Sequence, residues 1–183
     1  MKSEKEKMLA GELYRAGDEE LVQDRIKARQ LIAQYNTTTP IETDKRKEIL
    51  NQLLHAKNNV SIEPPFYCDY GYNIEIGDNF FANFLCVILD VNKVRIGDNV
   101  MFGPNVQIYT ATHPLDAKER IKGPELAKPI TIGDNVWIGG GVIICPGVII
   151  GSNTTIGAGS VVTKSIPANV FAAGNPCKVV KEL

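Results

Sequence analysis

A six-residue repeat of large apolar residues restricts the fold of this chain more than any other feature. The clearest run occupies six consecutive hexads: Ile132, Ile138, Ile144, Ile150, Ile156 and Val162. Strands this close together leave no room for the long helices of a doubly wound α/β fold. The repeat instead predicts a parallel β-helix, in which each hexad forms one short side and its apolar residue points inward. Each coil then buries its apolar row against neighbouring coils, so the stack stabilises itself.

Three sides would complete a coil of about 18 residues, which predicts the residues that stack on one another. The expected pairs are Ile132 with Ile150, Ile138 with Ile156, and Ile144 with Val162. The repeat is absent from residues 110–129, TATHPLDAKERIKGPELAKP. Ile96 and Ile132, on either side, are 36 residues apart, which is a whole number of hexads. We therefore expect an inserted loop at 110–129, after which the coils resume in phase.

Residues 1–58 follow helical rather than hexad periodicity. We expect a short helix over 4–15, a second from Asp18 to about residue 35, and a third over 43–56. Asp18 suits an N-cap, because its carboxylate can accept unpaired backbone N–H groups. The predicted organisation is a helical N-terminal segment, 1–58, and a β-helix domain, 59–183, with the inserted loop 110–129 and a C-terminal tail.

Charge and cysteine content exclude several classes of function. The chain has 20 basic and 21 acidic residues, so no basic excess indicates a nucleic-acid partner. The opening MKSEKEK has no apolar run, and Gly and Pro break the apolar stretches, so we expect neither a signal peptide nor a membrane span. The spacing of the four cysteines fits neither metal ligands nor a dense disulfide framework. We expect a cytoplasmic protein with reduced cysteines.

Several motifs are more specific than the repeat. EPPFYCDYGYNIEIGDNFFANF (63–84), TATHP, NVWIGG and GAGSVVTKSIPANVFAAGNPCKVV (157–180) resemble the maltose and galactoside O-acetyltransferases, a family of hexapeptide-repeat acyltransferases. The resemblance extends to the N-terminal EKMLAGELYRAGD and so covers nearly the whole chain. CDYGYN, TATHP and Glu125 in ELAKP are closer to the maltose type than to the galactoside type.

This resemblance carries expectations that the hexads alone do not. It implies a left-handed β-helix, against the usual right-handed crossover rule. It also implies a homotrimer with active sites between subunits, and acetyl-CoA as the co-substrate. The implied reaction is a direct transfer, in which a primary sugar hydroxyl, the 6-OH, attacks the thioester without a covalent acyl-enzyme.

Transfer to a hydroxyl requires a base, because an alcohol is a weak nucleophile at neutral pH. Histidine suits this role, since the ordinary pKa of its side chain lies near neutrality. The chain has two histidines: His55, at the end of a predicted helix, and His113, in the inserted loop. Pro114 favours an extended conformation for the residue before it. The catalytic histidine of the family aligns with His113, which the resemblance therefore implies as the general base.

The resemblance also implies an acceptor site. Asp69 and Asn83 match the acceptor-sugar pocket of the family, and Arg25 matches an acceptor-pocket arginine of the galactoside enzymes. Carboxylate and amide groups form directed hydrogen bonds to sugar hydroxyls, although each could equally cap a corner turn. Glu125 lies in the inserted loop and could either orient the histidine or bind the acceptor. Asp90 is out of register with an acidic position of the galactoside enzymes, so we leave it out of the predicted site.

The donor site rests on the resemblance alone. Trp137 aligns beside pantetheine, and Gly140 aligns with the position whose backbone N–H meets the thioester. Other positions match contacts further along CoA: Ala158, Thr163, Lys164, Lys178 and Lys181. Trp137 could instead pack at a corner or a subunit contact, and each lysine could be a solvated charge. No metal or other cofactor is implied.

Three other interpretations stay open. Zinc enzymes on the same fold need three histidines per site, and two histidines disfavour that reading. A non-catalytic scaffold would explain the hexads but not the long interruption, because such loops are usually functional or disordered. An acetyltransferase for a non-sugar or oligosaccharide acceptor would share the chemistry, and the sequence does not distinguish it.

Overall fold

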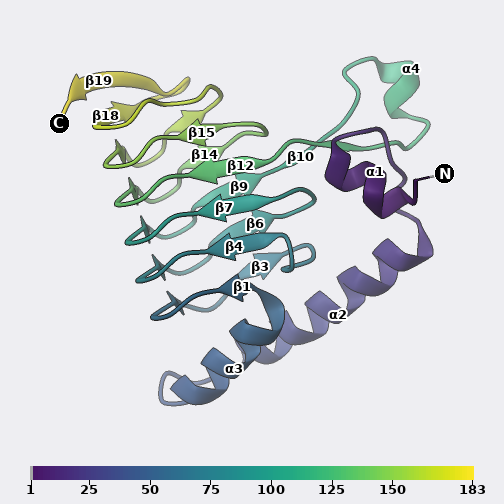
Figure 1. Ribbon diagram of the computed structural model, residues 1–183, viewed down its shortest axis with the longest axis horizontal. Coiled ribbons are helices and arrows are strands. Elements are labelled where there is room, and N and C mark those ends of the chain that lie inside the picture. The colour runs from purple at the N-terminus through teal and green to yellow at the C-terminus, as the bar shows by residue number, and fades with distance from the viewer. Residues whose placement is uncertain (1) are drawn as a thin grey trace.

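The computed structural model describes residues 2–183 and confirms a mainly β fold, a parallel solenoid of about six turns. Short strands stack on three faces, and the chain visits the faces in the same order in successive turns (Figure 1). We number the faces 1, 2 and 3 in that order, and we name each edge of the prism by the two faces that it joins.

The strands of each face pair in parallel along the solenoid. Face 1 contains β1 (His55–Ala56), β4 (Ile74–Ile76), β7 (Val94–Ile96), β12 (Ile130–Ile132) and β15 (Ile149–Ile150). Face 2 contains β2 (Ser61–Ile62), β5 (Phe81–Ala82), β8 (Met101–Phe102), β13 (Trp137–Ile138), β16 (Thr155–Ile156), β18 (Val170–Ala173) and the antiparallel β19 (Lys178–Glu182). Face 3 contains β3 (Tyr67–Cys68), β6 (Val87–Leu89), β9 (Gln107–Tyr109), β14 (Ile143–Ile144) and β17 (Val161–Val162).

The predicted apolar rows fill the interior of the solenoid. The register confirms the expected partners: Ile132 with Ile150, Ile138 with Ile156, and Ile144 with Val162. Each of these side chains is at most 1% exposed. Complete burial of such a side chain contributes roughly 1.5–3 kcal/mol, so every coil adds to the stability of its neighbours.

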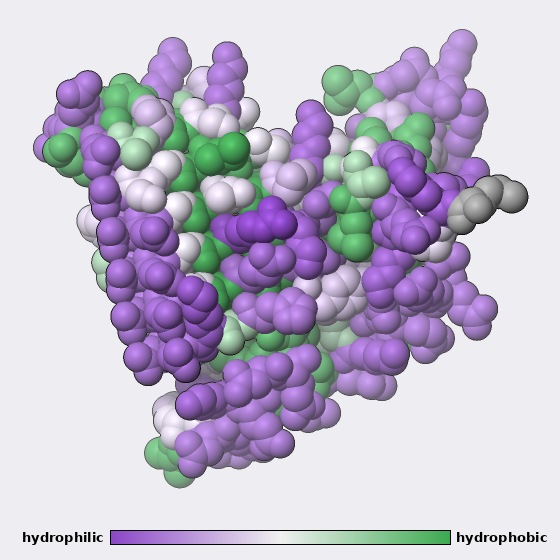
Figure 2. Space-filling model, in the orientation of Figure 1, coloured by the Kyte–Doolittle hydropathy of each residue, from purple (hydrophilic) through white to green (hydrophobic). Residues whose placement is uncertain are grey.

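The edge between faces 1 and 2, edge 1–2, is built from the IGDN motifs. Asn79, Asn99 and Asn135 have φ values of 57°, 56° and 57°, in the left-handed region that asparagine tolerates better than most residues. Their side-chain amides bond to one another along the edge at 3.1 Å. The carboxylates of Asp98 and Asp134 each accept a backbone N–H of the preceding coil at 2.8 Å. Figure 2 shows this edge as a hydrophilic column at the left of the molecule.

The edge between faces 3 and 1, edge 3–1, is where the first three coils depart from the hexad. In the first two coils the crossing takes eight residues, as from Ile88 to Ile96, against six at the other edges. In the third coil it takes 24 residues, from Ile108 to Ile132. Ile132 nevertheless pairs directly with Ile96, which confirms that the coils resume in phase after the insertion.

Three helices precede the solenoid and cover its first end and edge 3–1 (Figure 1). α1 (Glu4–Ala10) is shorter than predicted, because Gly11 adopts a φ of 72° and ends the helix. α2 (Glu19–Asn36) begins after Asp18, whose carboxylate accepts a first-turn N–H at 3.1 Å, as expected. α3 (Thr43–Leu53) buries its aliphatic stripe against the first coil.

The inserted segment has its own regular structure. β10 (Ala111–Thr112) and β11 (Leu126–Ala127) pair antiparallel, and α4 (Ala117–Arg120) lies between them in the chain. Figure 1 shows this hairpin leaving the solenoid at the right, beside α1. The hairpin is therefore held at its base by the coils and at its side by the N-terminal segment.

Candidate active site

Asp90 is the buried centre of edge 3–1. It follows β6, and its Oδ1 accepts the backbone N–H groups of Asp69 and Tyr70 at 3.0 and 2.8 Å. Its Oδ2 accepts the N–H of Asn73 at 3.3 Å. Burial raises the pKa of Asp90 to about 7, although the Tyr70 N–H acts against the rise. Asp90 is absent from the predicted site because it is out of register with the acidic position of the galactoside enzymes. Its role in holding the backbone of Asp69 and Tyr70 is visible only in the structure.

α2 delivers Arg25 to the same edge. Its guanidinium donates to the Tyr70 hydroxyl and to the Ala16 carbonyl, both at 2.6 Å. Burial raises the pKa of the neighbouring Asp69, and the positive charges of Arg25 and Arg29 partly oppose this. Arg25 and Asp69, which lie 44 positions apart in the chain, thus meet in one partly buried polar cluster.

The hairpin brings His113 and Glu125 to this cluster. His113 directly follows β10 and is exposed, while Glu125 directly precedes β11. Glu125 is close enough to Asp69 for its charge to raise the pKa of that carboxyl further. The structure therefore places four of the predicted residues at edge 3–1: Arg25, Asp69, His113 and Glu125.

Tyr14 ties the hairpin to the N-terminal segment. The N–H and C=O of Tyr14 bond to those of Glu125 at 3.1 and 3.0 Å, as an antiparallel bridge. The Tyr14 hydroxyl also donates to Glu125 Oε2 at 2.6 Å. Sequence reasoning missed Tyr14, because nothing in the local pattern of ELYRAG indicates a partner 111 residues away.

A second group of predicted residues lies at the edge between faces 2 and 3, edge 2–3. Asn83 follows β5, and its Oδ1 accepts the Phe84 N–H at 2.8 Å. Gly140 and Ala158 are the second residues after β13 and β16 in later coils of the same edge. Within residues 2–183 neither of these two N–H groups donates a hydrogen bond. Two backbone donors along edge 2–3 are therefore left without an acceptor.

Face 2 presents an apolar row beside this edge. Trp137 is 53% exposed and pairs with Met101, which is 51% exposed and pairs in turn with Phe81. Aligned outward-facing side chains of this size are unusual on a solvated sheet. The row is suited to contact with a ligand or with another chain.

The last four predicted donor-site residues lie toward the C-terminal end. Thr163 and Lys164 follow β17 and are exposed at edge 3–1. Lys178 and Lys181 are exposed on β19, where they pair with Ala173 and Phe171 of β18.

The predicted site is therefore divided between two edges within one chain. Asn83, Gly140 and Ala158 lie at edge 2–3, whereas Asp69 and His113 lie at edge 3–1, and face 3 separates the two. Across residues 2–183, no hydrogen bond or ion pair joins the two groups. A single chain does not bring Asn83, the asparagine predicted for the acceptor site, to His113.

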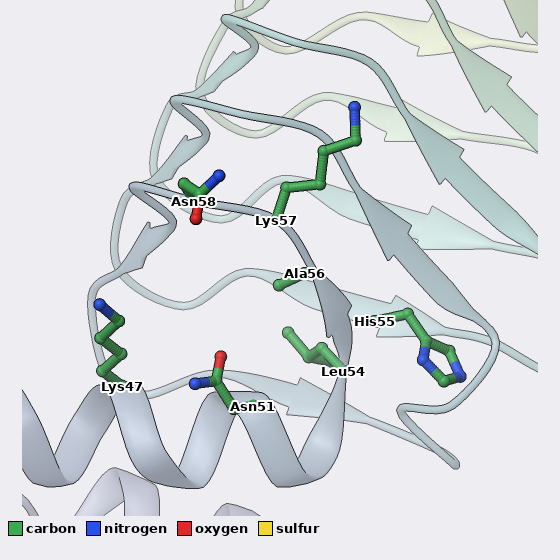
Figure 3. A pocket seen from close by; sticks show the side chains of 7 residues that line it. All are labelled: Lys47, Asn51, Leu54, His55, Ala56, Lys57 and Asn58. Atoms are coloured by element: carbon green, nitrogen blue, oxygen red, sulfur yellow. The ribbon is translucent and has the colours of Figure 1, made fainter.

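The other histidine, His55, belongs to a different region. A cavity of about 630 Å³ lies between α3 and the first coil, lined by Lys47, Asn51, His55 and Lys57 among others (Figure 3). The His55 ring points away from Lys47 and Asn51 in this view. The cavity contains none of the residues predicted for chemistry.

Over residues 2–183, no three His, Cys, Asp or Glu side chains are grouped so that they could hold a metal ion. None of the helices in this range has the length and apolar character needed to cross a bilayer.

Comparisons with known proteins agree with this architecture. Residues 7–57 match the family described as the maltose acetyltransferase hexapeptide capping motif, and residues 129–164 match the bacterial transferase hexapeptide, six repeats. A putative acetyltransferase of Saccharomyces cerevisiae is 55% identical over 97% of this chain and 92% of its own length.

Two solved structures superpose over the whole chain. The crystal structure of a maltose O-acetyltransferase from Clostridium difficile 630 has 56% identity and a TM-score of 0.98, covering 100% of this chain and 98% of that one. A galactoside acetyltransferase in complex with coenzyme A has 44% identity and a TM-score of 0.96, covering 100% and 92%. With identity at this level along the entire length, the chain belongs to the maltose and galactoside O-acetyltransferase family of hexapeptide-repeat acyltransferases.

Proposed function

We propose that this protein is an acetyl-CoA-dependent O-acetyltransferase that acetylates the primary 6-hydroxyl of a sugar of the maltose or glucose type. One observation carries the proposal: edge 3–1 gathers Arg25, Asp69 and the hairpin residues His113 and Glu125 from three distant parts of the chain. A solenoid scaffold has no need of such a cluster, which combines charged, half-buried groups with an exposed imidazole.

His113 acts as the general base. Its imidazole takes the proton of the sugar hydroxyl as the oxygen attacks the thioester carbonyl, and the same proton then passes to the departing CoA thiolate. General-base catalysis of this kind contributes about 10²–10⁴ in rate. The unpaired Gly140 N–H supports the reaction, because a fixed backbone donor stabilises the oxyanion that develops on the carbonyl oxygen.

The polar cluster suits a sugar acceptor. The Asp69 carboxylate accepts hydrogen bonds from hydroxyls, and the Arg25 guanidinium donates them. The partly exposed Tyr72 lies beside these groups, with its ring centroid 5.4 Å from that of the buried Tyr70, and an aromatic ring packs well on the apolar side of a sugar. Asn83 lies at edge 2–3, so it can complete the acceptor site at edge 3–1 only if it comes from another subunit.

A homotrimer supplies that completion. If each chain presents edge 2–3 to edge 3–1 of the next, Asn83, Trp137 and Gly140 of one subunit meet His113 of its neighbour. Contacts between two different surfaces close into rings when the rotation allows it, and three copies give three identical sites. The exposed row of Phe81, Met101 and Trp137 supports a contact on this side of the solenoid.

Acetyl-CoA is the donor in this proposal. Solved relatives are described in complex with coenzyme A or acetyl-CoA. In this chain the unpaired N–H groups of Gly140 and Ala158 suit the amide-rich pantetheine arm, and Trp137 suits its apolar stretches. Thr163, Lys164, Lys178 and Lys181 are exposed where a nucleotide phosphate could reach them.

An acceptor screen tests the reaction. The purified protein is incubated with acetyl-CoA and glucose, maltose, galactosides, oligosaccharides or non-sugar alcohols, and kcat/KM is measured from thiol release. The proposal expects the highest kcat/KM with glucose or maltose. A higher value with an oligosaccharide or a non-sugar replaces the acceptor class, and no acceptor-dependent release supports a scaffold.

Subunit mixing tests the shared site. His113→Ala and Asn83→Ala proteins should each be inactive alone, because each lacks one half of every site. After unfolding and refolding of a 1:1 mixture, about a quarter of the interfaces in a heterologous ring would combine both intact halves. Activity near a quarter of the wild-type value is expected, and no recovery above the separate variants contradicts a site shared between subunits.

A further inference from the structure

Tyr14 is a buried phenol in a segment without regular structure. Its side chain is 1% exposed, although the residues on both sides of it are exposed. Its hydroxyl donates to Oε2 of Glu125, and its backbone bonds to Glu125 in both directions. Three hydrogen bonds therefore join this one residue to the inserted hairpin.

The hairpin register extends this contact to His113. Thr112 lies opposite Leu126 in the β10–β11 pair, so one further step along both strands sets His113 opposite Glu125. Opposite residues of an antiparallel pair turn their side chains to the same side, with Cβ atoms about 4.5–5.5 Å apart. Tyr14 lies opposite Glu125 on its other flank, and their side chains share a face because they are hydrogen-bonded. The three residues thus form one row across three chain segments.

The bonding of the Glu125 carboxylate shows what this row can do. Oε2 is occupied by the Tyr14 hydroxyl, whereas Oε1 accepts no hydrogen bond within residues 2–183. Burial raises the pKa of Tyr14, and the bond to Glu125 raises it further. The phenol therefore stays a donor throughout the working pH range. A carboxylate held on one side in this way can accept from an imidazole N–H on the other, which fixes the ring tautomer and orientation.

We propose that Tyr14 is a positioning residue, whose hydroxyl holds Glu125 so that the free carboxylate oxygen orients the imidazole of His113. This inference rests on the proposed role of His113 as general base. It assigns a part of the reaction to the N-terminal segment, and it decides between the two roles open to Glu125 in favour of orientation.

Tyr35 provides a matched control. It is also 1% exposed, and its hydroxyl also donates a hydrogen bond, but to the backbone carbonyl of Ile62 under α2. Removing either hydroxyl deletes one buried hydrogen bond from the folded protein. Only the Tyr14 hydroxyl leads to a side chain beside His113, so a purely structural role predicts the same behaviour for both variants.

The kinetic test compares Tyr14→Phe, Tyr35→Phe, Glu125→Gln and the Tyr14→Phe/Glu125→Gln double variant. Tyr14→Phe should lower kcat about tenfold, as expected for the loss of one charge-assisted hydrogen bond, with KM for acetyl-CoA unchanged. Tyr35→Phe should retain kcat. The double variant should be no slower than Glu125→Gln, because both changes break the same chain of contacts. A Tyr14→Phe kcat within twofold of wild type, or fully additive losses, overturns the inference.

A spectroscopic test needs no acceptor. The chain has only two histidines, so the imidazole signals of ¹⁵N-histidine-labelled protein can be assigned with His113→Ala. Tyr14→Phe should shift the His113 ring signals and leave those of His55 in place, whereas Tyr35→Phe should move neither. Unchanged His113 signals in Tyr14→Phe overturn the inference even if the His113→Ala variant is inactive. Shifted signals in a protein that acetylates no acceptor keep the coupling and refute the proposed function instead.

Discussion

Edges 1–2 and 3–1 run along the same solenoid and serve opposite purposes. Edge 1–2 repeats one corner in every coil, with its asparagine amides bonded to one another. Edge 3–1 differs in composition in each of the first three coils, and the third crossing is also much longer than the first two. Edge 3–1 can vary because edge 1–2 does not. The repeated corners of edge 1–2 already determine the register between neighbouring coils, whatever the chain does at edge 3–1.

The two edges also satisfy their polar groups differently. At edge 1–2 the backbone N–H groups of Gly77, Asp78 and Asn79 each have an acceptor in an adjacent coil. At edge 3–1 Asn73 Oδ1 is buried without a hydrogen-bond partner among residues 2–183, and Asp90 carries a raised pKa. Buried groups that lack partners destabilise a fold and concentrate at functional sites. Edge 3–1 therefore reduces stability, and edge 1–2 offsets the loss.

The largest expected effect is that of His113→Ala, which should lower activity at edge 3–1 without lowering stability. Because the side chain is exposed and makes no hydrogen bond within residues 2–183, its removal should leave the thermal unfolding midpoint unchanged. The kcat should fall by about 10²–10⁴, the usual contribution of a general base. Parallel measurement of kcat and Tm checks this, and near-normal turnover would refute the assignment of the base.

Gly97→Ala should break edge 1–2 without touching the chemistry. A Cβ at this position would lie 2.3 Å from Asp134 Oδ1 and 2.8 Å from the Asp134 backbone nitrogen. Relief requires the coils to separate, at a cost of about 3 kcal/mol in the free energy of unfolding. Urea unfolding measures the loss, and the kcat of the folded fraction should stay at the wild-type value.

Gly17→Ala is the control for that substitution, since no atom lies within 4 Å of its added Cβ. Its free energy of unfolding should match that of the wild type. An equal loss in both variants would show that the steric argument for edge 1–2 is wrong.

Asp90→Asn should change how stability depends on pH at edge 3–1. Folding raises the pKa of Asp90 from an unfolded value of about 3.9 to about 7. The raised pKa favours the protonated form, so its stabilising contribution is complete below pH 4 and lost as pH rises to 7. An asparagine side chain does not titrate in this range. Its amide NH₂ group would face the Asn73 N–H in place of Oδ2, so the variant should lose about 2 kcal/mol in the free energy of unfolding.

The measurement is urea unfolding of both proteins at several pH values between 4 and 8. The wild-type advantage should be largest at pH 4 and shrink toward pH 8. Parallel stability curves would mean that Asp90 does not titrate in this interval.

Asn135→Ala should give the smallest change. It removes two side-chain hydrogen bonds of the edge 1–2 ladder and places alanine at a φ of 57°, together worth about 1–2 kcal/mol. Asn135→Gly keeps the backbone conformation accessible, so the difference between the two variants separates strain from hydrogen bonding. Equal thermal shifts would show that the backbone conformation contributes nothing.

The sequence predicts edge 1–2 and the interior well because both depend on residues that are local or evenly spaced. The hexads determine which side chains face inward, and the phase match of Ile96 with Ile132 shows where the coils resume. Edge 3–1 is harder to predict, since its contacts join segments far apart in the chain. Tyr14 and Asp90 belong to no periodic pattern in the sequence. Their roles can be inferred only from the residues that they contact in the folded structure.

The C-terminal end of α1 is also predicted incorrectly from the sequence. Helix-forming residues follow Gly11 in the sequence, but a left-handed glycine ends α1 at Ala10. Such a glycine is a local stop signal, which the predicted helix over 4–15 does not take into account. The bridge from Tyr14 to Glu125 then pairs the chain beyond it with the hairpin.

The pairing of β10 with β11 at the base of the insertion has a consequence for how such enzymes could diversify. Because Ala111 lies opposite Ala127 in this pair, the two ends of the insertion are held about 4.8 Å apart whatever lies between them. Doubling the length of a flexible loop closed in this way costs only about 0.6 kcal/mol of chain entropy. New hairpins could therefore be exchanged at this crossing, and acceptor preference could change, while the folding of the prism stays almost untouched.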